Sequence, residues 1–206
     1  HYAGVIVTAW FVKKVLMDSG CALPIHVIAL PLVANPHAQQ SSAQDLARVS
    51  QHQAVNLLHV SSAFPRKGVD VLLQAFEQLA AADPALTLTL KTFPNPHNQV
   101  EGWVEQYVSA KHRERLHIII EDYDAAQMAA LYQGADIVVL PTRGEGLNMP
   151  AIEAGEFSRA LVVTGYGAHT DFTPAPHTGW VNYCFDHAQS HFSAGQAVWV
   201  EPSVAS

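Results

Sequence analysis

RGEGLNMPAIEAGE, residues 143–156, places two glutamates eight positions apart. Glu145 precedes the loop-like segment GLNMP, whereas Glu153 lies three residues beyond Pro150 in a segment of good helix formers. The two carboxylates therefore cannot be neighbours on one helix. Whether they meet in space depends on the fold that the surrounding sequence adopts.

Strand-like and helix-like segments alternate on both sides of this stretch. The run ADIVVLPT just before it is so apolar that both faces of a strand would be buried there. Strands are predicted at residues 4–10, 24–30, 55–63, 85–93, 116–120, 135–142 and 160–165. Helices are predicted at 11–20, weakly after 33–45, from 64 to about 82, and at 99–115, 125–133 and 149–157. The tail, residues 182–203, is predicted to be irregular.

The helix that follows residue 63 has the clearest periodicity. Val69, Leu72, Leu73, Phe76 and Leu79 are predicted to form one apolar stripe, which the sequence ADP then ends. Alternation of this kind predicts parallel strands joined by helical crossovers. The predicted fold class is therefore α/β, with a doubly wound parallel sheet.

Ligands in such a fold bind at the carboxyl ends of the strands, where loops lead into helices. Three loops with polar side chains follow predicted strands, at residues 61–68, 141–150 and 164–172. All three would open on the same edge of the sheet. Glu145 in its loop and Glu153 in the following helix are therefore expected to face one crevice.

Composition and charge narrow the classes of partner. The 206 residues carry 11 basic and 18 acidic side chains, and this net charge of -7 argues against a general nucleic-acid or anionic-membrane surface. Cys21 and Cys184 match no metal or redox spacing and indicate a reducing, cytoplasmic compartment. No apolar run approaches the roughly 20 residues of a membrane span. Anionic ligands would therefore bind only at local sites.

The residues at the predicted crevice suit a nucleotide sugar. The helix that begins after GLNMP presents unpaired N–H groups and the positive end of a dipole, and Gly146 lets the backbone approach a ligand closely. A carboxylate accepts hydrogen bonds from two adjacent sugar hydroxyls. Lys67, with Arg66 beside it, supplies positive charge for a diphosphate.

Three segments carry a resemblance to a known family. GEGLNMPAIEAGE resembles the signature of two glutamates separated by seven residues in retaining GT-B glycosyltransferases of group 1. HVSSAFPRKGVDVLLQAF resembles the strand, loop and helix of that family that contain a lysine–glycine pair, and DAAQMAALYQGADIVVLPT resembles the segment before the signature. The similarity covers most of residues 24–203.

The resemblance implies a division of the chain. Residues 1–22 would be the last strand and helix of an N-terminal acceptor domain. Residues 23–206 would be a Rossmann-like C-terminal domain that binds the nucleotide-sugar donor and is truncated at its C-terminal end. The chain alone is expected to bind donor weakly and to transfer nothing.

Site roles follow from the resemblance residue by residue. Glu153 would hold the ribose hydroxyls, Glu145 would contact the transferred sugar, and Lys67 would neutralise the diphosphate leaving group. The resemblance also implies that no metal and no cofactor is needed, because Lys67, an arginine and the helix dipole supply the positive charge. The backbone N–H groups expected to hold the sugar and phosphate are those of Gly146, Leu147, Asn148 and Met149.

The sequence departs from the family pattern at one charged position. Ser62 stands where the family often has an arginine, and Arg66 is the nearby cation that would compensate. The segment GYGAHTDF resembles a glycine-rich loop of some members, which implies that His169 and Asp171 line the site.

The implied activity is transfer of a sugar, with retention, from a nucleotide diphosphate sugar to an acceptor. The acceptor would be a glycan or another small molecule bound by the N-terminal domain, as in cytoplasmic polysaccharide biosynthesis. Nucleic acid is not an expected partner, and peripheral membrane association of the whole enzyme is compatible with this function. Two alternatives stay open: a non-catalytic sugar-nucleotide-binding or scaffolding module, and a GT-B sugar-nucleotide epimerase.

Single residues also have other interpretations. Glu145 and Glu153 would suit the first turns of a helix, Lys67 a surface position and His169 a hydrogen-bonded loop. The spacing of His187 and His191 would suit a metal, but no nearby acid completes a set of ligands, so no metal site is predicted.

Overall fold

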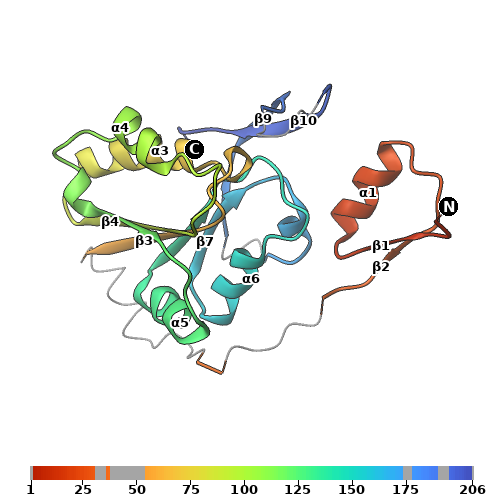
Figure 1. Ribbon diagram of the computed structural model, residues 1–206, viewed down its shortest axis with the longest axis horizontal. Coiled ribbons are helices and arrows are strands. Elements are labelled where there is room, and N and C mark those ends of the chain that lie inside the picture. The colour runs from red at the N-terminus through yellow and green to blue at the C-terminus, as the bar shows by residue number, and fades with distance from the viewer. Residues whose placement is uncertain (1, 31–35, 38–53, 174–177, 190–194, 206) are drawn as a thin grey trace.

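The computed structural model describes residues 2–30, 36–37, 54–173, 178–189 and 195–205. Their centre is a six-stranded sheet in which every neighbouring pair is parallel, with helices on both faces (Figure 1). Its strands are, in spatial order, β5 (Leu116–Ile120), β4 (Leu86–Thr92), β3 (Val55–Val60), β6 (Ile137–Leu140), β7 (Ala160–Thr164) and β8 (Thr178–Val181). The predicted doubly wound α/β fold is confirmed.

One face of the sheet is covered by α3 (Val69–Ala82) and α4 (Val100–Tyr107). The predicted stripe on α3 is buried at its first four positions, and Phe76 and Leu73 are completely inaccessible. The prediction is wrong for Leu79, which is 52% exposed. In the last turn of α3 the inward position falls to Ala80 instead, so the stripe ends one residue later and on a smaller side chain.

The opposite face is covered by α5 (Ala125–Gly134) and α6 (Met149–Glu156). Asp124 caps α5, accepting a hydrogen bond from the backbone N–H of Gln127 in a capping box. Between the two helices, the rings of Tyr132 and Phe157 stack with centroids 5.3 Å apart. This packing fixes α6, whose N-terminus follows the Glu145 loop.

The tail is not irregular as predicted. Within it, β9 (Tyr183–His187) pairs in antiparallel register with β10 (Val198–Pro202). Just before the tail, β8 adds a parallel edge strand to the sheet that was not predicted. Every residue of β9 is exposed, and in β10 Val200 is fully buried while Val198 is 58% exposed. Because so little of this hairpin is buried, it leaves almost no apolar alternation in the sequence.

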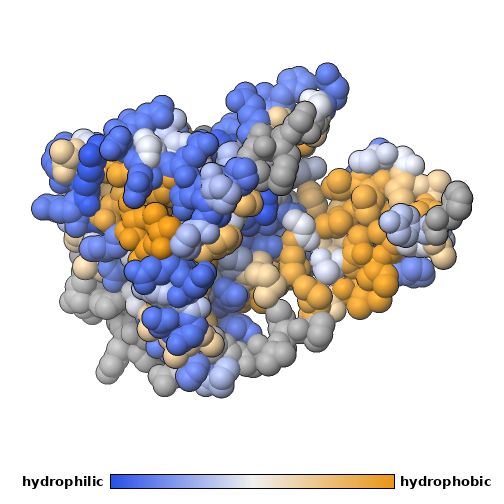
Figure 2. Space-filling model, viewed as in Figure 1, coloured by the Kyte–Doolittle hydropathy of each residue, from blue (hydrophilic) through white to orange (hydrophobic). Residues whose placement is uncertain are grey.

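The N-terminal segment forms a separate small unit. β1 (Val5–Val7) pairs in parallel with β2 (Ile25–Val27), and α1 (Trp10–Asp18) connects them. The strand predicted at 24–30 thus pairs with β1 and not with the six-stranded sheet. Figure 2 shows apolar side chains gathered over this unit, and the large exposed ones are Tyr2, Ile6, Trp10, Val15, Met17, Leu23, Ile28 and Leu30.

Two further expectations concern a weak helix in the N-terminal half and a membrane-spanning segment. The weak helix predicted after residues 33–45 lies outside the described residues, apart from residues 36–37. Within the described ranges, no helix combines the length and apolar character needed to cross a bilayer.

Gly68 sets the approach of the β3 loop to the β6 loop. It has φ +69° between the 3-10 helix η1 (Pro65–Lys67) and α3, in the left-handed region that favours glycine. A Cβ built on it would lie 1.9 Å from the carbonyl oxygen of Pro141. The lysine–glycine pair therefore brings Lys67 beside the strand that leads to Glu145.

Gly68→Ala is expected to reduce the free energy of unfolding by more than about 2 kcal/mol, because the left-handed conformation and the contact with Pro141 both become unfavourable. Urea denaturation would measure the change. Gly102→Ala is the matched control: Gly102 lies inside α4 with open space around its Cβ position, so alanine should stabilise by about 0.5–1 kcal/mol. Equal effects at the two sites would contradict this account.

His59 is a buried titratable group in the central strand β3. It is 1% exposed, and its ring nitrogens lie 2.7 Å from the carbonyl oxygen of Val139 and 2.8 Å from Oγ of Ser61. Burial lowers the pKa of His59 from 6.5 to about 4, and the positive charge of Lys67 acts in the same direction. The unfolded chain therefore binds more protons than the folded chain between these pH values.

The neutral state of His59 should consequently contribute fully to the free energy of unfolding above pH 6.5. This contribution should be lost as the pH falls toward 4. Wild-type protein is expected to lose roughly 2 kcal/mol more than His59→Gln between about pH 7.5 and pH 5, because glutamine does not titrate and still donates to Val139. Urea denaturation at both pH values checks this. The same pH dependence in both proteins would show that His59 is not responsible.

Candidate functional site

The strand order reverses direction between β3 and β6. From β3 the chain adds β4 and β5 on one side, and it then returns to place β6, β7 and β8 on the other. In open α/β sheets the crevice at the carboxyl ends of such neighbouring strands is where ligands bind. The loop after β3 contains Lys67, and the loop after β6 contains Glu145, so both come to this crevice.

Lys67 and Glu145 form a direct ion pair there. Nζ of Lys67 lies 2.5 Å from Oε1 of Glu145, and the two side chains are only 11% and 5% exposed. Nη1 of Arg66 lies 3.5 Å from the other oxygen, Oε2, and donates to the carbonyl oxygen of Gly144 at 3.2 Å. One buried carboxylate is thus held by two cations from the neighbouring loop.

Burial lowers the pKa of Lys67, and the carboxylate of Glu145 opposes this effect only in part. A nearby anion strongly stabilises the charged form of a buried ammonium group. Lys67 is therefore suited to contact a phosphate as well as Glu145.

Three residues separate Glu145 from the N-terminus of α6, with Asn148 as the residue before its first turn. Asn148, with φ 72°, is the N-cap, and a Cβ added at Gly146 would meet nothing within 4 Å. The segment thus combines free space with the amino end of a helix, a favourable place for an anion. The carbonyl oxygen of Gly146 accepts a hydrogen bond from Oγ1 of Thr8 at 3.4 Å, which brings the N-terminal segment to the same loop.

His169 is hydrogen-bonded to the side chain of Asn148, the N-cap of α6. It is completely buried, with Nε2 at 2.7 Å from the carbonyl oxygen of Thr164 and Nδ1 at 3.3 Å from Nδ2 of Asn148. Nε2–H therefore donates to Thr164, and Nδ1 accepts from Asn148. Burial lowers the pKa of His169, which favours this neutral form. Its position fits a hydrogen-bonded loop histidine, while direct contact with a donor stays a prediction.

Glu153 is half-buried one turn into α6. Its Oε2 accepts a 2.6 Å hydrogen bond from the hydroxyl of Tyr132 on α5. Burial raises the pKa of Tyr132, and the charge of Glu153 adds to the rise, so the tyrosine remains a donor. This bond orients the carboxylate, and sequence reasoning missed it because Tyr132 lies on another helix, 21 positions away.

Ser62 and Asp171 occupy different surroundings. Oγ of Ser62 is buried and has no hydrogen-bond partner among the described atoms, while its carbonyl oxygen accepts from Asn95. Arg66 is the arginine that the structure brings to Glu145. Asp171, in η3 (Ala168–Asp171), accepts a 3.0 Å hydrogen bond from the backbone N–H of Phe11, so it joins the N-terminal segment to the loop after β7.

A cavity of about 870 Å³ lies next to this charged site, between the N-terminal segment and α6. Leu147 and Ile152 line it on one side, and Trp10 and Leu30 line it on the other. Its lining is mostly apolar, and Lys67 and Glu145 are outside it. Leu147 is thus placed at the border of the two sites.

Arg143 belongs to the stretch with the two glutamates, and the sequence predicted no role for it. It precedes Glu145 by two positions, is 6% exposed, and pairs with both Asp70 and Glu201. Burial lowers the pKa of Arg143, but its hydrogen bonds to these two carboxylates more than compensate and raise it. The position of Arg143 in the Glu145 loop was the signal in the sequence that could have indicated its importance. Its partner Glu201 lies 58 positions further along the chain.

The described residues include no group of three or more His, Cys, Asp or Glu placed to hold a metal ion. His187 lies in the exposed strand β9, and His191 falls outside the described ranges. Cys21 and Cys184, which both fall inside those ranges, have free thiols.

The sequence profile of a family described as glycosyl transferases group 1 matches residues 54–189. This range contains β3 to β9 together with Lys67, Glu145 and Glu153. The chain belongs to this family. The predicted resemblance to the group 1 glycosyltransferases is therefore confirmed. A comparison with curated proteins gave no match.

Solved structures share the fold. Sucrose-phosphate synthase from Thermosynechococcus elongatus aligns with a TM-score of 0.70 at 21% identity over 88% of this chain and 46% of its own. A glycosyltransferase from Rickettsia africae ESF-5 aligns at 0.67 with 17% identity over 87% and 49%. Anabaena HepE, solved in complex with UDP and glucose, aligns at 0.64 with 17% identity over 84% and 47%. These similarities establish the GT-B type of fold, and the chain spans about half the length of these structures.

Lys67→Met should lower the free energy of unfolding by about 3 kcal/mol, because it leaves the buried Glu145 without its closest cation. Adding Glu145→Gln should recover more than half of that loss. Urea denaturation of both single variants and the double variant measures the coupling.

Lys14→Met is the control, since Lys14 pairs with Asp18 on the surface of α1 and both side chains are more than half exposed. It should change stability by less than about 0.5 kcal/mol. Additive effects of Lys67→Met and Glu145→Gln would contradict the coupled pair.

Proposed function

We propose that this chain is the donor-binding part of a retaining glycosyltransferase that uses a nucleotide diphosphate sugar. The observation that carries the proposal is the ion pair of Lys67 and Glu145 at the reversal of the strand order, beside the N-terminus of α6. Family membership supports the same activity. A cation, N–H donors and two carboxylates at one sheet edge suit a diphosphate and a sugar together.

Lys67 has the main chemical role in this proposal. As the bond between the sugar and the diphosphate breaks, negative charge accumulates on the leaving phosphate oxygens. Nζ of Lys67 and the N–H groups of Gly146, Leu147, Asn148 and Met149 stabilise that charge, which lowers the barrier. No metal and no cofactor is part of this proposal, and Arg66 supplies additional positive charge.

Glu145 and Glu153 bind hydroxyl groups. Glu145 accepts from the transferred sugar, and Glu153 accepts from the ribose through the oxygen that Tyr132 leaves available. Because the Tyr132 hydroxyl fixes one carboxylate oxygen, the other is already oriented when the ribose arrives. His169 acts by holding Asn148, the N-cap of the helix that binds the phosphate.

The acceptor side belongs to a second domain in this proposal. Residues 1–22 represent its last strand and helix, and β2 continues the same small sheet beyond that boundary. The many exposed apolar side chains of this unit support a larger domain that covers them. The whole enzyme transfers the sugar in the cytoplasm, and the chain alone binds donor without transferring it.

One observation favours a second candidate, a sugar-nucleotide-binding module without catalysis. Ser62 replaces an arginine frequent in the family, and its buried hydroxyl is unpaired among the described atoms. A binding module would need less positive charge at the diphosphate than an enzyme that expels it. The ion pair of Lys67 and Glu145 weighs against this candidate.

Isothermal titration of the chain with UDP, GDP and ADP, without added metal, tests donor binding. HepE was solved with UDP and glucose, so UDP is the first probe. Glu153→Ala should weaken binding of the preferred nucleotide at least about tenfold, because the charged acceptor of the ribose hydrogen bond is lost. Glu105→Ala, on the exposed face of α4, is the control and should bind as wild type does. No binding of any nucleotide, or equal binding by Glu153→Ala, would contradict the proposal.

A further inference from the structure

We propose that Arg143 is a positioning residue that holds Lys67 and Glu145 in the arrangement the diphosphate requires, with the β9–β10 hairpin as part of its support. The inference rests on the proposed function and assigns this chain's own tail a role in it. Arg143 does not touch the donor itself.

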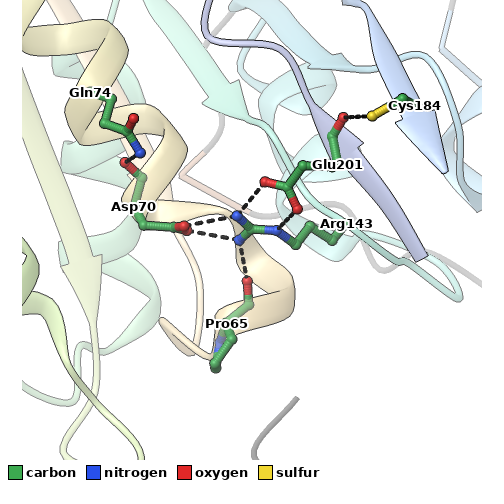
Figure 3. Close-up of polar contacts among 6 residues, drawn as sticks. All are labelled: Pro65, Asp70, Gln74, Arg143, Cys184 and Glu201. Carbon is green, nitrogen blue, oxygen red and sulfur yellow. Dashed lines mark hydrogen bonds and ion pairs between the residues drawn. The ribbon is translucent and has the colours of Figure 1, made fainter. Parts of the chain in front are cut away.

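The guanidinium group of Arg143 uses all of its N–H groups inside the protein (Figure 3). Nη1 and Nη2 donate to the two oxygens of Asp70 at 2.8 Å each, and Nε and Nη2 donate to the two oxygens of Glu201 at 2.6 Å each. The remaining Nη1–H donates to the carbonyl oxygen of Pro65 at 2.7 Å. Since an arginine has five N–H donors, none remains for a phosphate.

These partners come from three elements around the ion pair. Pro65 belongs to η1, two residues before Lys67; Asp70 lies in the first turn of α3; and Glu201 lies on β10. Arg143 itself lies two residues before Glu145. One side chain therefore connects the loop that carries the anion with the loop that carries the cation.

Backbone hydrogen bonds make the same connections. The N–H of Arg143 donates to the carbonyl oxygen of Arg66 at 2.7 Å, and the N–H of Val200 donates to the carbonyl oxygen of Arg143 at 3.1 Å. The Trp199 ring lies over the guanidinium, 5.2 Å from its central carbon. The hairpin is thus attached to the site through three consecutive residues of β10.

The charge balance explains why the position requires arginine. Asp70 and Glu201 place two carboxylates around one guanidinium whose side chain is 7% exposed. Without the cation, two partly buried anions would repel each other. Lysine would keep the charge but could not make two bidentate contacts at once. Removing Arg143 should therefore let the two loops move apart.

The first experiment needs no ligand. The chain is treated with a limiting amount of an acetylating N-hydroxysuccinimide ester, and acetylation of Lys67 is followed by mass spectrometry relative to the exposed Lys111. Arg143→Gln should raise the relative rate at Lys67 severalfold, Arg143→Lys should give an intermediate rate, and Glu201→Gln should give a smaller rise.

Arg115→Gln is the matched control. Arg115 donates to the carbonyl oxygens of Ala80 and Asp83 at the other end of α3, far along the helix from Asp70. Its removal should lower the melting temperature without changing the acetylation of Lys67. If Arg143→Gln fails to fold, Glu201→Gln against Arg115→Gln decides the question.

The second experiment compares UDP with UMP by titration calorimetry. A misplaced Lys67 should reduce the affinity for UDP relative to UMP about tenfold in Arg143→Gln, the worth of one charge-assisted hydrogen bond, and leave UMP affinity unchanged. Loss of stability alone would weaken both nucleotides equally. If wild type binds neither nucleotide, the proposed function fails while acetylation still tests the positioning. Folded Arg143 and Glu201 variants with wild-type Lys67 acetylation would overturn the inference.

Discussion

The adjacency of β3 and β6 is the constraint on which the site depends. Because these parallel strands are neighbours, their carboxyl ends deliver Lys67 and Glu145 to the same place from positions 78 residues apart. Each charge is buried, so each would be costly without the other. The pair thus fixes the relative position of the two loops, and Gly68 permits it by letting the chain pass beside Pro141 without a Cβ.

The small N-terminal unit meets this site through a few specific contacts. Thr8 reaches the carbonyl oxygen of Gly146, Asp171 accepts from the N–H of Phe11, and the rings of Phe11 and Tyr166 meet edge to face with centroids 4.8 Å apart. An apolar cavity occupies the space beside these contacts. Such a sparse junction resembles a boundary between domains more than a continuous core.

Sequence patterns predicted the elements that bury an apolar face and the site residues in loops that follow neighbouring strands. The alternation of elements gave the parallel sheet, and the position of loops after strands placed Lys67 and Glu145 together. The partner of Glu153 was not predictable, because Tyr132 reads as an ordinary apolar residue of α5. Glu201 was equally hidden in a hairpin with little burial. Both contacts are created by packing between elements, for which a single sequence carries no local signal.

The division of the positive charge determines what a ligand can use. All N–H donors of Arg143 are bound to two carboxylates and a carbonyl oxygen, so this residue stabilises the fold and cannot also bind a ligand. Lys67 forms a close ion pair with Glu145. The side chain of Arg66 is 40% exposed, and its Nη1 lies 3.5 Å from Oε2 of Glu145. In the proposed function a diphosphate would therefore meet one partly exposed arginine, one lysine already held in place, and the dipole of α6. Since Ser62 adds no charge, the fixed position of Lys67 matters more here than it would beside a second arginine.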